Sequence, residues 1–293
     1  MESNELIKKV RRIEIKTRRI SNNIFAGEYH TAFKGRGMSF SEVREYQYGD
    51  EVRFIDWNVT ARYRRPYIKV YEEERELTVM LLVDVSKSNL FGSGEQFKRD
   101  IINEIAATLA FSTIQNNDKV GVIFFSDKIE KFIPPQKGRK HVLYIIRELI
   151  DFKPASNSTD IEVVLKYLTN VIKKRCTAFV LSDFIAPNNY NDAAVIANRK
   201  HEIIRLRVYD QRDREIPDVG LIKLKDPETE KRMWVNTSSK KVRMLYKNHW
   251  DETSLVSQRI MVGAGIESVD IEVRQDYIKL LLGLFRKKTA LKF

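Results

Sequence analysis

Cysteine and long apolar runs are scarce in this sequence of 293 residues. The one cysteine, Cys176, excludes a disulfide within the chain and any metal site built from several thiolates. The longest apolar stretch near the C-terminus, Leu280 to Phe285, is far too short to cross a bilayer, and the N-terminus lacks the apolar core of a signal peptide. We therefore expect a cytoplasmic protein, and we leave open that it lies peripherally on the inner membrane.

Motifs of common enzymes are missing as well. The sequence has no G-x-x-x-x-G-K-[ST] loop for nucleotide phosphates and no G-x-S-x-G turn that would expose a nucleophilic serine. The four histidines lie outside the predicted strand-end loops, and none has a metal or nucleophile partner at a recognisable spacing. The sequence shows no obvious general base, so we expect a protein that is not an enzyme.

Basic residues, by contrast, are in excess. The chain has 52 Lys and Arg against 40 Asp and Glu, a net charge of +12. This charge favours an acidic protein face, nucleic acid or an anionic membrane as partner, although a lysine-rich soluble surface explains it equally well. Residues 1–25 predict a basic amphipathic helix, whose apolar stripe suits either a membrane surface or packing on the chain's own domain. We favour the second of these.

The rest of the chain divides by pattern into three parts. Residues 26–76 mix glycines with short polar and aromatic segments, which predicts a small β-rich module. Over residues 77–286 strands alternate with helices, with a β-hairpin inserted at 211–237, and residues 287–293 form a basic tail. The alternation predicts an α/β fold: a doubly wound, mostly parallel sheet with helices on both faces.

Polar side chains at the ends of predicted strands form a candidate site. An apolar, β-branched run predicts a buried strand, and Asp84, Ser86 and Ser88 follow it directly. Thr159 precedes a predicted helix, and Asp183 ends another predicted strand. The carboxyl ends of central parallel strands face one crevice, so a single cation could be reached from all of them. Hydroxyl and carboxylate oxygens suit magnesium, and also manganese or calcium, better than zinc.

Simpler interpretations stay open at this stage. Asp84 could cap the following turn or helix, and Ser158 and Thr159 could be N-cap residues of the helix predicted at 160–173. A phosphatase of the haloacid dehalogenase type would need a second Asp where Ser86 stands. The hydroxyl-rich set carries little negative charge, so a cation bound there would accept a carboxylate from another protein.

These residues resemble the metal ion-dependent adhesion site of a von Willebrand factor A domain, and the resemblance covers about residues 77–286. It implies a metal held by a first loop with Asp84, Ser86 and Ser88, a second with Thr159 and a third with Asp183. In that family the metal binds an acidic side chain of a partner and catalyses nothing. The resemblance therefore implies a binding site.

A second resemblance covers almost the whole chain and points to the family called domain of unknown function 58. It rests on Lys34-Gly35-Arg36-Gly37, Phe40-Ser41-Glu42-Val43-Arg44-Glu45-Tyr46, Gly49-Asp50, Arg53, Ile55-Asp56-Trp57 and Ala61-Arg62, and then on Asp210, Pro217-Asp218 and Asp226-Pro227-Glu228-Thr229. The sequence departs from the family pattern at Asn89, where Met is frequent, and at Glu230, where Gly is common. Members are typically associated with AAA+ ATPases of the MoxR type, which implies an adaptor in chaperone-like assembly or metal insertion.

Charges of both signs alternate around aromatic residues in the signature segment, at Arg44, Asp50, Arg53, Asp56 and Arg62. Structural ion pairs would explain this pattern, and so would a recognition surface rich in Arg, Tyr and Trp. We favour the ion pairs.

Our first hypothesis is a non-enzymatic adaptor that binds an acidic residue of a MoxR-type AAA+ ATPase, or of its client, through a divalent cation. The alternative is a protein that binds an anionic membrane or, less favoured, nucleic acid, and whose binding weakens steeply with salt. That activity would use the N-terminal helix and the basic residues Arg286, Lys287, Lys288 and Lys292. A metal-dependent hydrolase is a third hypothesis, and it lacks a base.

Overall fold

The structure is a computed structural model that describes residues 11, 13–16, 38–73, 76–92, 96–185, 188–225 and 232–290. It contains two compact units: Phe33–Leu77, and Met1–Ala32 together with Thr78–Phe293. Most of the helix expected over 1–25 lies outside the described residues, as do the hairpin turn at 226–231 and the chain end at 291–293.

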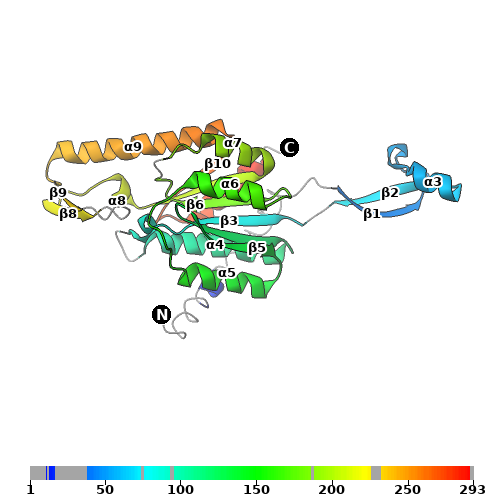
Figure 1. Cartoon of the computed structure of the whole chain (residues 1–293), viewed down its shortest axis with the longest axis horizontal. Coiled ribbons are helices and arrows are strands. Elements are labelled where there is room, and N and C mark those ends of the chain that lie inside the picture. The colour runs from blue at the N-terminus through cyan, green and yellow to red at the C-terminus, as the bar shows by residue number, and fades with distance from the viewer. Residues whose placement is uncertain are drawn as a thin grey trace. The chain divides into compact units, whose positions relative to one another are not determined.

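A six-stranded sheet forms the centre of the larger unit (Figure 1). Its strands are β3 (Thr78–Asp84), β4 (Lys119–Phe125), β5 (Ile129–Gln136), β6 (Thr177–Ser182), β7 (Glu202–Tyr209) and β10 (Glu267–Glu272). In space they run β10-β7-β6-β3-β4-β5, and every neighbouring pair is parallel except β4 with β5. The chain leaves β3 towards β4 on one side and later returns to β6 on the other, so the strand order reverses at β3. In open α/β sheets this is the point where ligands bind.

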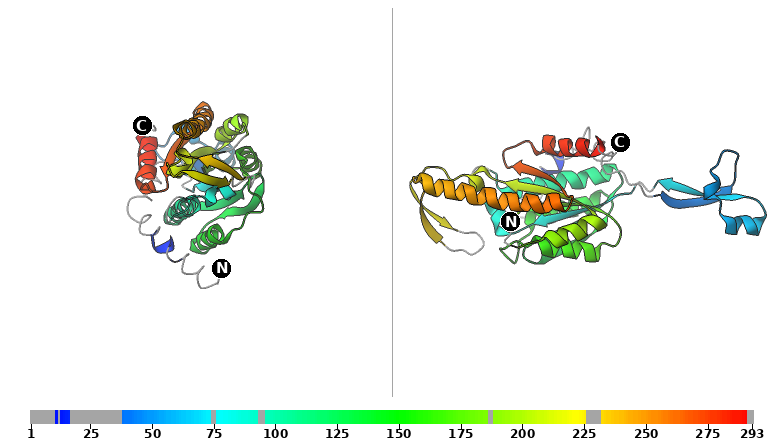
Figure 2. Two further views of the ribbon diagram at one scale, coloured as in Figure 1. Left: turned by 90° about the vertical axis from the view of Figure 1, so that its left-hand side faces the viewer. Right: turned by 90° about the horizontal axis from the view of Figure 1, so that it is seen from above.

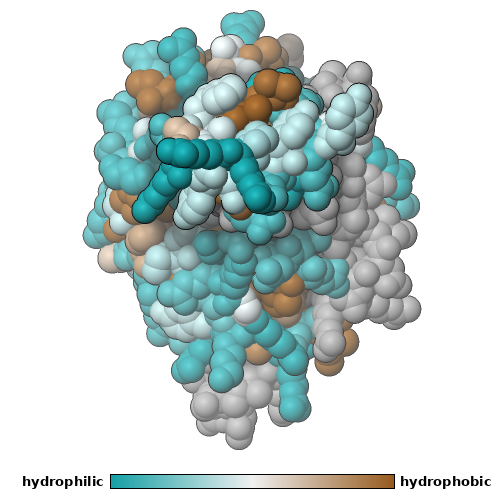
Figure 3. Space-filling model, turned by 90° about the vertical axis from the view of Figure 1, so that its right-hand side faces the viewer, coloured by the Kyte–Doolittle hydropathy of each residue, from teal (hydrophilic) through white to brown (hydrophobic). Residues whose placement is uncertain are grey.

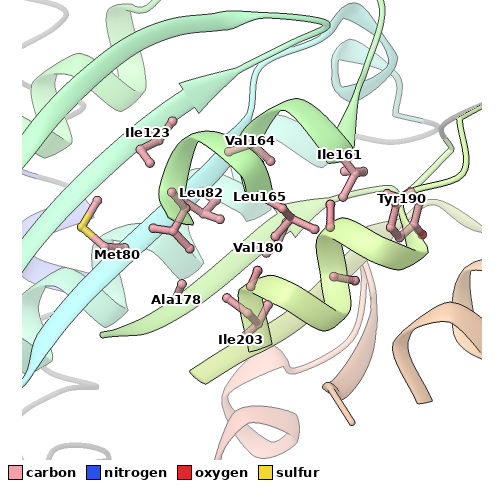
Figure 4. Packing of buried hydrophobic residues seen from close by; sticks show 14 of the residues in the cluster. Met80, Leu82, Ile123, Ile161, Val164, Leu165, Ala178, Val180, Tyr190 and Ile203 are labelled. Carbon is pink, nitrogen blue, oxygen red and sulfur yellow. The ribbon is translucent and has the colours of Figure 1, made fainter. Parts of the chain in front are cut away.

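Helices cover both faces of the sheet, which confirms the predicted α/β fold. Figures 1 and 2 show α6 (Ile161–Val171), α7 (Asn191–Lys200) and α9 (Lys240–Gly263) on one face, and α4 (Lys98–Gln115), α5 (Arg139–Asp151) and α10 (Tyr277–Ala290) on the other. Because β3 is covered on both faces, every residue from Val79 to Asp84 is buried. Figure 4 shows one of these faces, where Met80 and Leu82 of β3 belong to one buried cluster with Leu165 and Val180.

Gly121 of β4 lies close against the neighbouring strands β5 and β3. A Cβ atom at this position would lie 2.8 Å from the Ile133 carbonyl oxygen and 2.9 Å from the Met80 sulfur. Gly121→Ala should therefore destabilise the protein by about 1–3 kcal/mol, measured by urea unfolding. Gly283→Ala, in the middle of α10, is the matched control, because nothing lies within 4 Å of its Cβ; this helical substitution should stabilise by about 0.5–1 kcal/mol. Equal effects of the two substitutions would contradict the crowding.

The insertion after β7 consists of the short helix α8 (Gln211–Arg214) and the hairpin β8 (Leu221–Lys225) with β9 (Arg232–Asn236). Figures 1 and 2 show this hairpin beside the start of α9, beyond the carboxyl ends of the sheet strands. The helix α10 continues to Ala290, so the first residues of the expected basic tail are helical. Lys288 is buried, with its Nζ 2.5 Å from Glu202, and it does not present its charge to an external surface.

Two of the described residues near the N-terminus make ion pairs with helices of the same unit. Lys16 pairs with Glu104 of α4, and Glu14 pairs with Arg139 of α5, each at 2.5 Å. These contacts accord with packing on the chain's own domain, the interpretation that we favoured. No helix within the described ranges is long and apolar enough to cross a membrane. On the face seen in Figure 3, hydrophobic side chains form small separate patches among hydrophilic ones.

The smaller unit contains a two-stranded antiparallel sheet of β1 (Met38–Glu45) and β2 (Tyr67–Glu73), with a bulge in β1. Between the strands lie the 3₁₀ helix η2 (Val52–Phe54) and the helix α3 (Trp57–Tyr63). The sequence pattern did not predict α3. Its N-cap is Asp56, whose carboxylate accepts hydrogen bonds from the backbone N–H groups of Asn58 and Val59.

Ion pairs account for part of the charge alternation in this unit. The Arg44 guanidinium holds Asp50 through two bonds of 2.7 and 2.9 Å, and Lys69 lies 3.4 Å from Asp56. The hydrogen bond from Arg44, followed by one from the Gln47 N–H, lowers the pKa of Asp50 below its ordinary 3.8.

This lowered pKa predicts an acid sensitivity of the smaller unit. A carboxyl whose folded-state pKa is depressed stabilises the fold above its unfolded pKa, and loses that contribution as the pH falls through the folded value. Amide exchange at Gln47 and Asp50 in the intact chain should therefore accelerate below about pH 4, after correction for intrinsic rates. In Asp50→Asn this extra acceleration should be absent. The same pH profile in both proteins would contradict the prediction.

Candidate functional site

Asp84 ends the central strand β3 and organises the turn that follows it. Its Oδ1 accepts a hydrogen bond of 2.9 Å from the Ser86 N–H, which bends the chain into the short helix η3 (Lys87–Leu90). Ser86 and Ser88 are both buried, and their Oγ atoms lie 3.0 Å apart. The expectation that Asp84 caps the following turn is therefore correct for one of its two oxygens.

The other oxygen of Asp84 draws the neighbouring segments together. Ser182, at the end of β6, donates to Asp84 Oδ2 at 2.5 Å, and Thr159 donates to the same atom at 3.4 Å. Thr159 is not the N-cap of α6, because Asp160 takes that role through the N–H of Glu162. The alternative interpretation of Thr159 as a cap was therefore wrong, and its hydroxyl is directed to the site.

Both carboxylates near the turn are buried. Asp84 is 2% exposed and Asp183 is 0% exposed. Burial, followed by the charge of Asp183, raises the pKa of Asp84 to about 6, although the bonds from Ser182 and Ser86 act in the opposite direction. A cation beside Asp84 would relieve this repulsion.

The charge of Asp183 acts on Asp84, while the oxygens of Asp183 accept hydrogen bonds from other groups. Its Oδ1 accepts from the Ile185 N–H at 3.1 Å, and its Oδ2 from Lys98 Nζ at 2.9 Å. Lys98 is 1% exposed, and its Nζ also lies 3.1 Å from Asp213 Oδ2. Burial acts to lower the pKa of Lys98, but the charges of Asp183 and Asp213 outweigh it and the pKa is raised, so the ammonium stays charged.

This buried ion pair connects the strand ends to the insertion, because Asp213 belongs to α8. Asp210, which directly follows β7, caps α8 by accepting from the Arg212 N–H at 2.8 Å. Lys98 is the first residue of α4, where the positive end of the helix dipole disfavours a cation. The two carboxylates offset that cost.

The residues present fit an oxygen-coordinated cation. Asn89 is buried and donates from Nδ2 to the Asp84 carbonyl and to Ser86 Oγ, both at 3.3 Å, whereas its Oδ1 is buried without a hydrogen-bond partner. An unpaired buried oxygen beside hydroxyl groups suits a hard cation or its water. The described part of the chain contains no cluster of three or more His, Cys, Asp or Glu that could hold a metal, so a cation here would rely on hydroxyls.

Cys176 and His201 lie together at the amino end of the neighbouring strands, away from these side chains. The Cys176 Sγ is 3.3 Å from His201 Nδ1, and both residues are buried. Burial raises the pKa of the thiol to about 12. Burial, followed by the charges of Lys200 and Arg175, lowers the pKa of His201 to about 4. A neutral thiol beside a neutral imidazole is a poor nucleophile, so this pair is structural.

Sequence reasoning missed three partners in the cluster. Ser182 had a signal, because it immediately precedes Asp183 at a strand end. Lys98 and Asp213 had none, since they lie 85 and 30 residues from Asp183 in sequences without a distinctive pattern. The five residues predicted as metal ligands do gather at one edge of the sheet, with Asp183 held by Lys98.

Comparisons with known proteins show the family of this chain. The family model described as "Protein of unknown function DUF58" matches residues 42–254. The proteins Mb1516 of Mycobacterium bovis and Rv1480 of Mycobacterium tuberculosis, both described as uncharacterized, are each 31% identical to the chain over 222 residues, which is 75% of this chain and 70% of theirs. YeaD of Bacillus subtilis, also uncharacterized, is 27% identical over 37% of this chain and 25% of its own.

Among solved structures, an aerotolerance-related membrane protein from Bacteroides fragilis matches with a TM-score of 0.52 at 14% identity, covering 73% of this chain and 99% of that one. The VWA domain of SpRpn10 matches with a TM-score of 0.41 at 10% identity, over 72% of this chain and 95% of its own. Likeness at this level of identity concerns the fold alone. With the strand order above, the larger unit has a von Willebrand factor A-like fold.

Proposed function

Because the chain belongs to the family described as "Protein of unknown function DUF58", whose description names no activity, we propose a function from the site itself. The larger unit is a non-enzymatic binding module. A divalent cation, magnesium or in its place manganese or calcium, is held at the carboxyl edge of the sheet and takes a carboxylate of a partner protein as a ligand. The partner is a MoxR-type AAA+ ATPase or a client of that ATPase.

The convergence of hydroxyl groups on Asp84 carries this proposal. Ser86 and Ser88 follow the central strand, and Thr159 arrives from a loop 75 residues further on. All three are buried, with exposures of 1%, 7% and 2%. Buried hydroxyls gathered from distant segments would be poorly explained by packing alone, and oxygen ligands of low charge leave a hard cation able to accept an outside carboxylate.

The roles of the individual residues follow from their contacts. Ser86, Ser88 and Thr159 would supply oxygens to the cation, and Asp84 would supply charge and fix the turn. Asp183 would act through its charge, because Lys98 and the Ile185 N–H hold its oxygens. When bound, the cation would supply a Lewis-acidic position for a partner's carboxylate.

A hydrolase is less well supported. In the described part of the chain, the Asp84 carboxylate accepts hydrogen bonds from the Ser86 N–H and from the hydroxyls of Thr159 and Ser182, and none of these groups is a base near neutral pH. A membrane-binding role rests on a basic N-terminal helix that lies mostly outside the described residues, and Lys288 is engaged inside the fold.

Copurification with a MoxR-type AAA+ ATPase tests the proposed function. The intact chain should retain the ATPase in the presence of magnesium and release it when the cation is chelated. Asp84→Ala should abolish retention, and Ser112→Ala, a buried serine on α4 that donates to the Thr108 carbonyl, should leave it unchanged. Retention of the ATPase that persists in the chelator would contradict the cation's role. The circular dichroism spectrum of the Asp84→Ala protein must equal that of the unaltered chain, which shows that the variant is folded.

A further inference from the structure

A large cavity begins beside the candidate cation site and extends along the insertion. Its volume is about 1640 Å³, and its lining includes Ser88 of η3 and residues of α8, the β8–β9 hairpin and α9. A pocket that takes one small molecule typically measures about 300–1000 Å³. The volume of this cavity is larger. Its lining comes both from η3, which follows β3, and from the β8–β9 hairpin.

The hairpin contributes an apolar wall. Residues opposite each other in an antiparallel pair point to the same face, and Ile222 pairs with Val235 and Leu224 with Met233. Ile222, Leu224 and Met233 all line the cavity, and Met233 is 64% exposed. An apolar face of this kind gains stability only when something covers it.

The helix α9 supplies the facing wall. Tyr246, Thr253, Val256 and Ile260 line the cavity and recur at spacings of three, four and seven residues, so they share one side of the helix. Val256 is 56% exposed. The two walls therefore present apolar side chains to the space between them.

The charges of the lining indicate the chemistry of what binds. Lys98 and Asp213 neutralise each other within the wall. The other charged lining residues are Lys87, Arg212 and Lys225 on the basic side and Glu252 on the acidic side, with His249 beside them. The lining thus combines apolar walls with more basic than acidic side chains, which complements an occupant that is apolar and acidic.

We propose that this cavity docks a polypeptide segment of the partner in which an Asp or Glu is flanked by apolar side chains. The apolar side chains lie between the hairpin and α9, and the carboxylate lies beside Ser88, where the cation would take it. This inference rests on the proposed function, because it assigns to the same partner both the carboxylate and its apolar surroundings. It assigns the insertion the role of selecting which acidic segment is bound.

The chain offers a matched pair of variants for this proposal. Val256→Asp places a charge in the cavity wall, and Val262→Asp makes the same change on the same helix outside the lining, where the residue is 69% exposed. Both positions are at the surface, so neither substitution burdens the core. Ser86→Ala with Ser88→Ala removes two of the cation's proposed ligands and leaves the apolar side chains of the hairpin and α9 intact.

The experiment selects binders for the intact chain from a phage-displayed library of random 16-residue peptides, in magnesium. The dissociation constants of the enriched peptides are then measured by fluorescence polarisation. We expect sequences with an Asp or Glu beside apolar residues. Their affinity should fall at least tenfold in Val256→Asp, in the double serine variant and in chelator, and should be unchanged in Val262→Asp. Changing the acidic residue of the peptide to its amide should have the same effect as the chelator.

The outcomes separate the two proposals. If Val256→Asp binds normally while the serine variant and chelator abolish binding, the cavity proposal is wrong and the cation site stands. If Val256→Asp abolishes binding but the chelator and the amide do not, the cavity binds an apolar segment without the cation, which overturns both the link proposed here and the proposed function. No enrichment, or enrichment of peptides without carboxylates, also overturns the cavity proposal.

Discussion

Lys98→Met is expected to lower the free energy of unfolding by about 3–5 kcal/mol, because removing one partner of a buried ion pair leaves an uncompensated charge. Lys98 and Asp183 are 1% and 0% exposed in their side chains, and they lie 2.9 Å apart. Asp213 loses the same partner, at 3.1 Å. Urea unfolding followed by circular dichroism measures the loss.

Lys166→Met is the matched control for this prediction. Lys166 pairs with Glu162 on the surface of α6 at 2.7 Å and is 63% exposed, so its loss should change stability by about 0.5 kcal/mol or less. Combining Lys98→Met with Asp183→Asn should recover part of the stability, since both charges of the closest pair are then removed. If Lys98→Met unfolds at the same urea concentration as the unaltered chain, the buried pair does not have the energetic role that its geometry indicates.

Replacing both Ser86 and Ser88 by alanine should weaken manganese binding by about 100-fold or more, given that losing even a residue that only supports a metal ligand costs about 10–100-fold. The two Oγ atoms are 3.0 Å apart, and Ser86 Oγ also accepts from Asn89. The substitutions remove only oxygens, and both residues lie outside the strands, so the fold should persist. Affinity is measured by titration with Mn²⁺.

Ser112→Ala provides the control for the serine pair, because it makes the same change at another buried position in the larger unit. Its affinity for Mn²⁺ should equal that of the unaltered chain. An unchanged affinity in the double variant would show that the cation, if bound, is held elsewhere.

The sheet and the order of the candidate ligands were predictable from the sequence for a physical reason. A strand covered on both faces must be apolar throughout, so the apolar run before Asp84 predicts a buried strand. Polar residues directly after such a run fall at the carboxyl edge of the sheet. The same reasoning applied to Asp183 after β6. The same reasoning covers Ser182, which precedes Asp183. We predicted only Asp183 at this strand end, whereas in the structure Ser182 also contacts the site, through its bond to Asp84.

Contacts between distant segments were not predictable in this way. The bond between Lys98 and Asp183 spans 85 residues, and neither an unusual spacing nor a motif marks the lysine. The cavity depends on how the hairpin folds back towards α9, which hydrophobic period alone does not specify. In the smaller unit, the sequence did not predict α3. Asp56 fits the alternating charges of that segment, but in the structure it caps this helix.

Electron paramagnetic resonance of Mn²⁺ titrated with the unaltered chain tests the central claim most directly, because free Mn²⁺ gives a strong signal that decreases on binding to protein. We predict one bound Mn²⁺ per chain, displaced by Mg²⁺ and absent in the variant with Ser86→Ala and Ser88→Ala. A free Mn²⁺ signal that the chain leaves unchanged, or a decrease of equal size in the double variant, would contradict a cation site at this edge of the sheet.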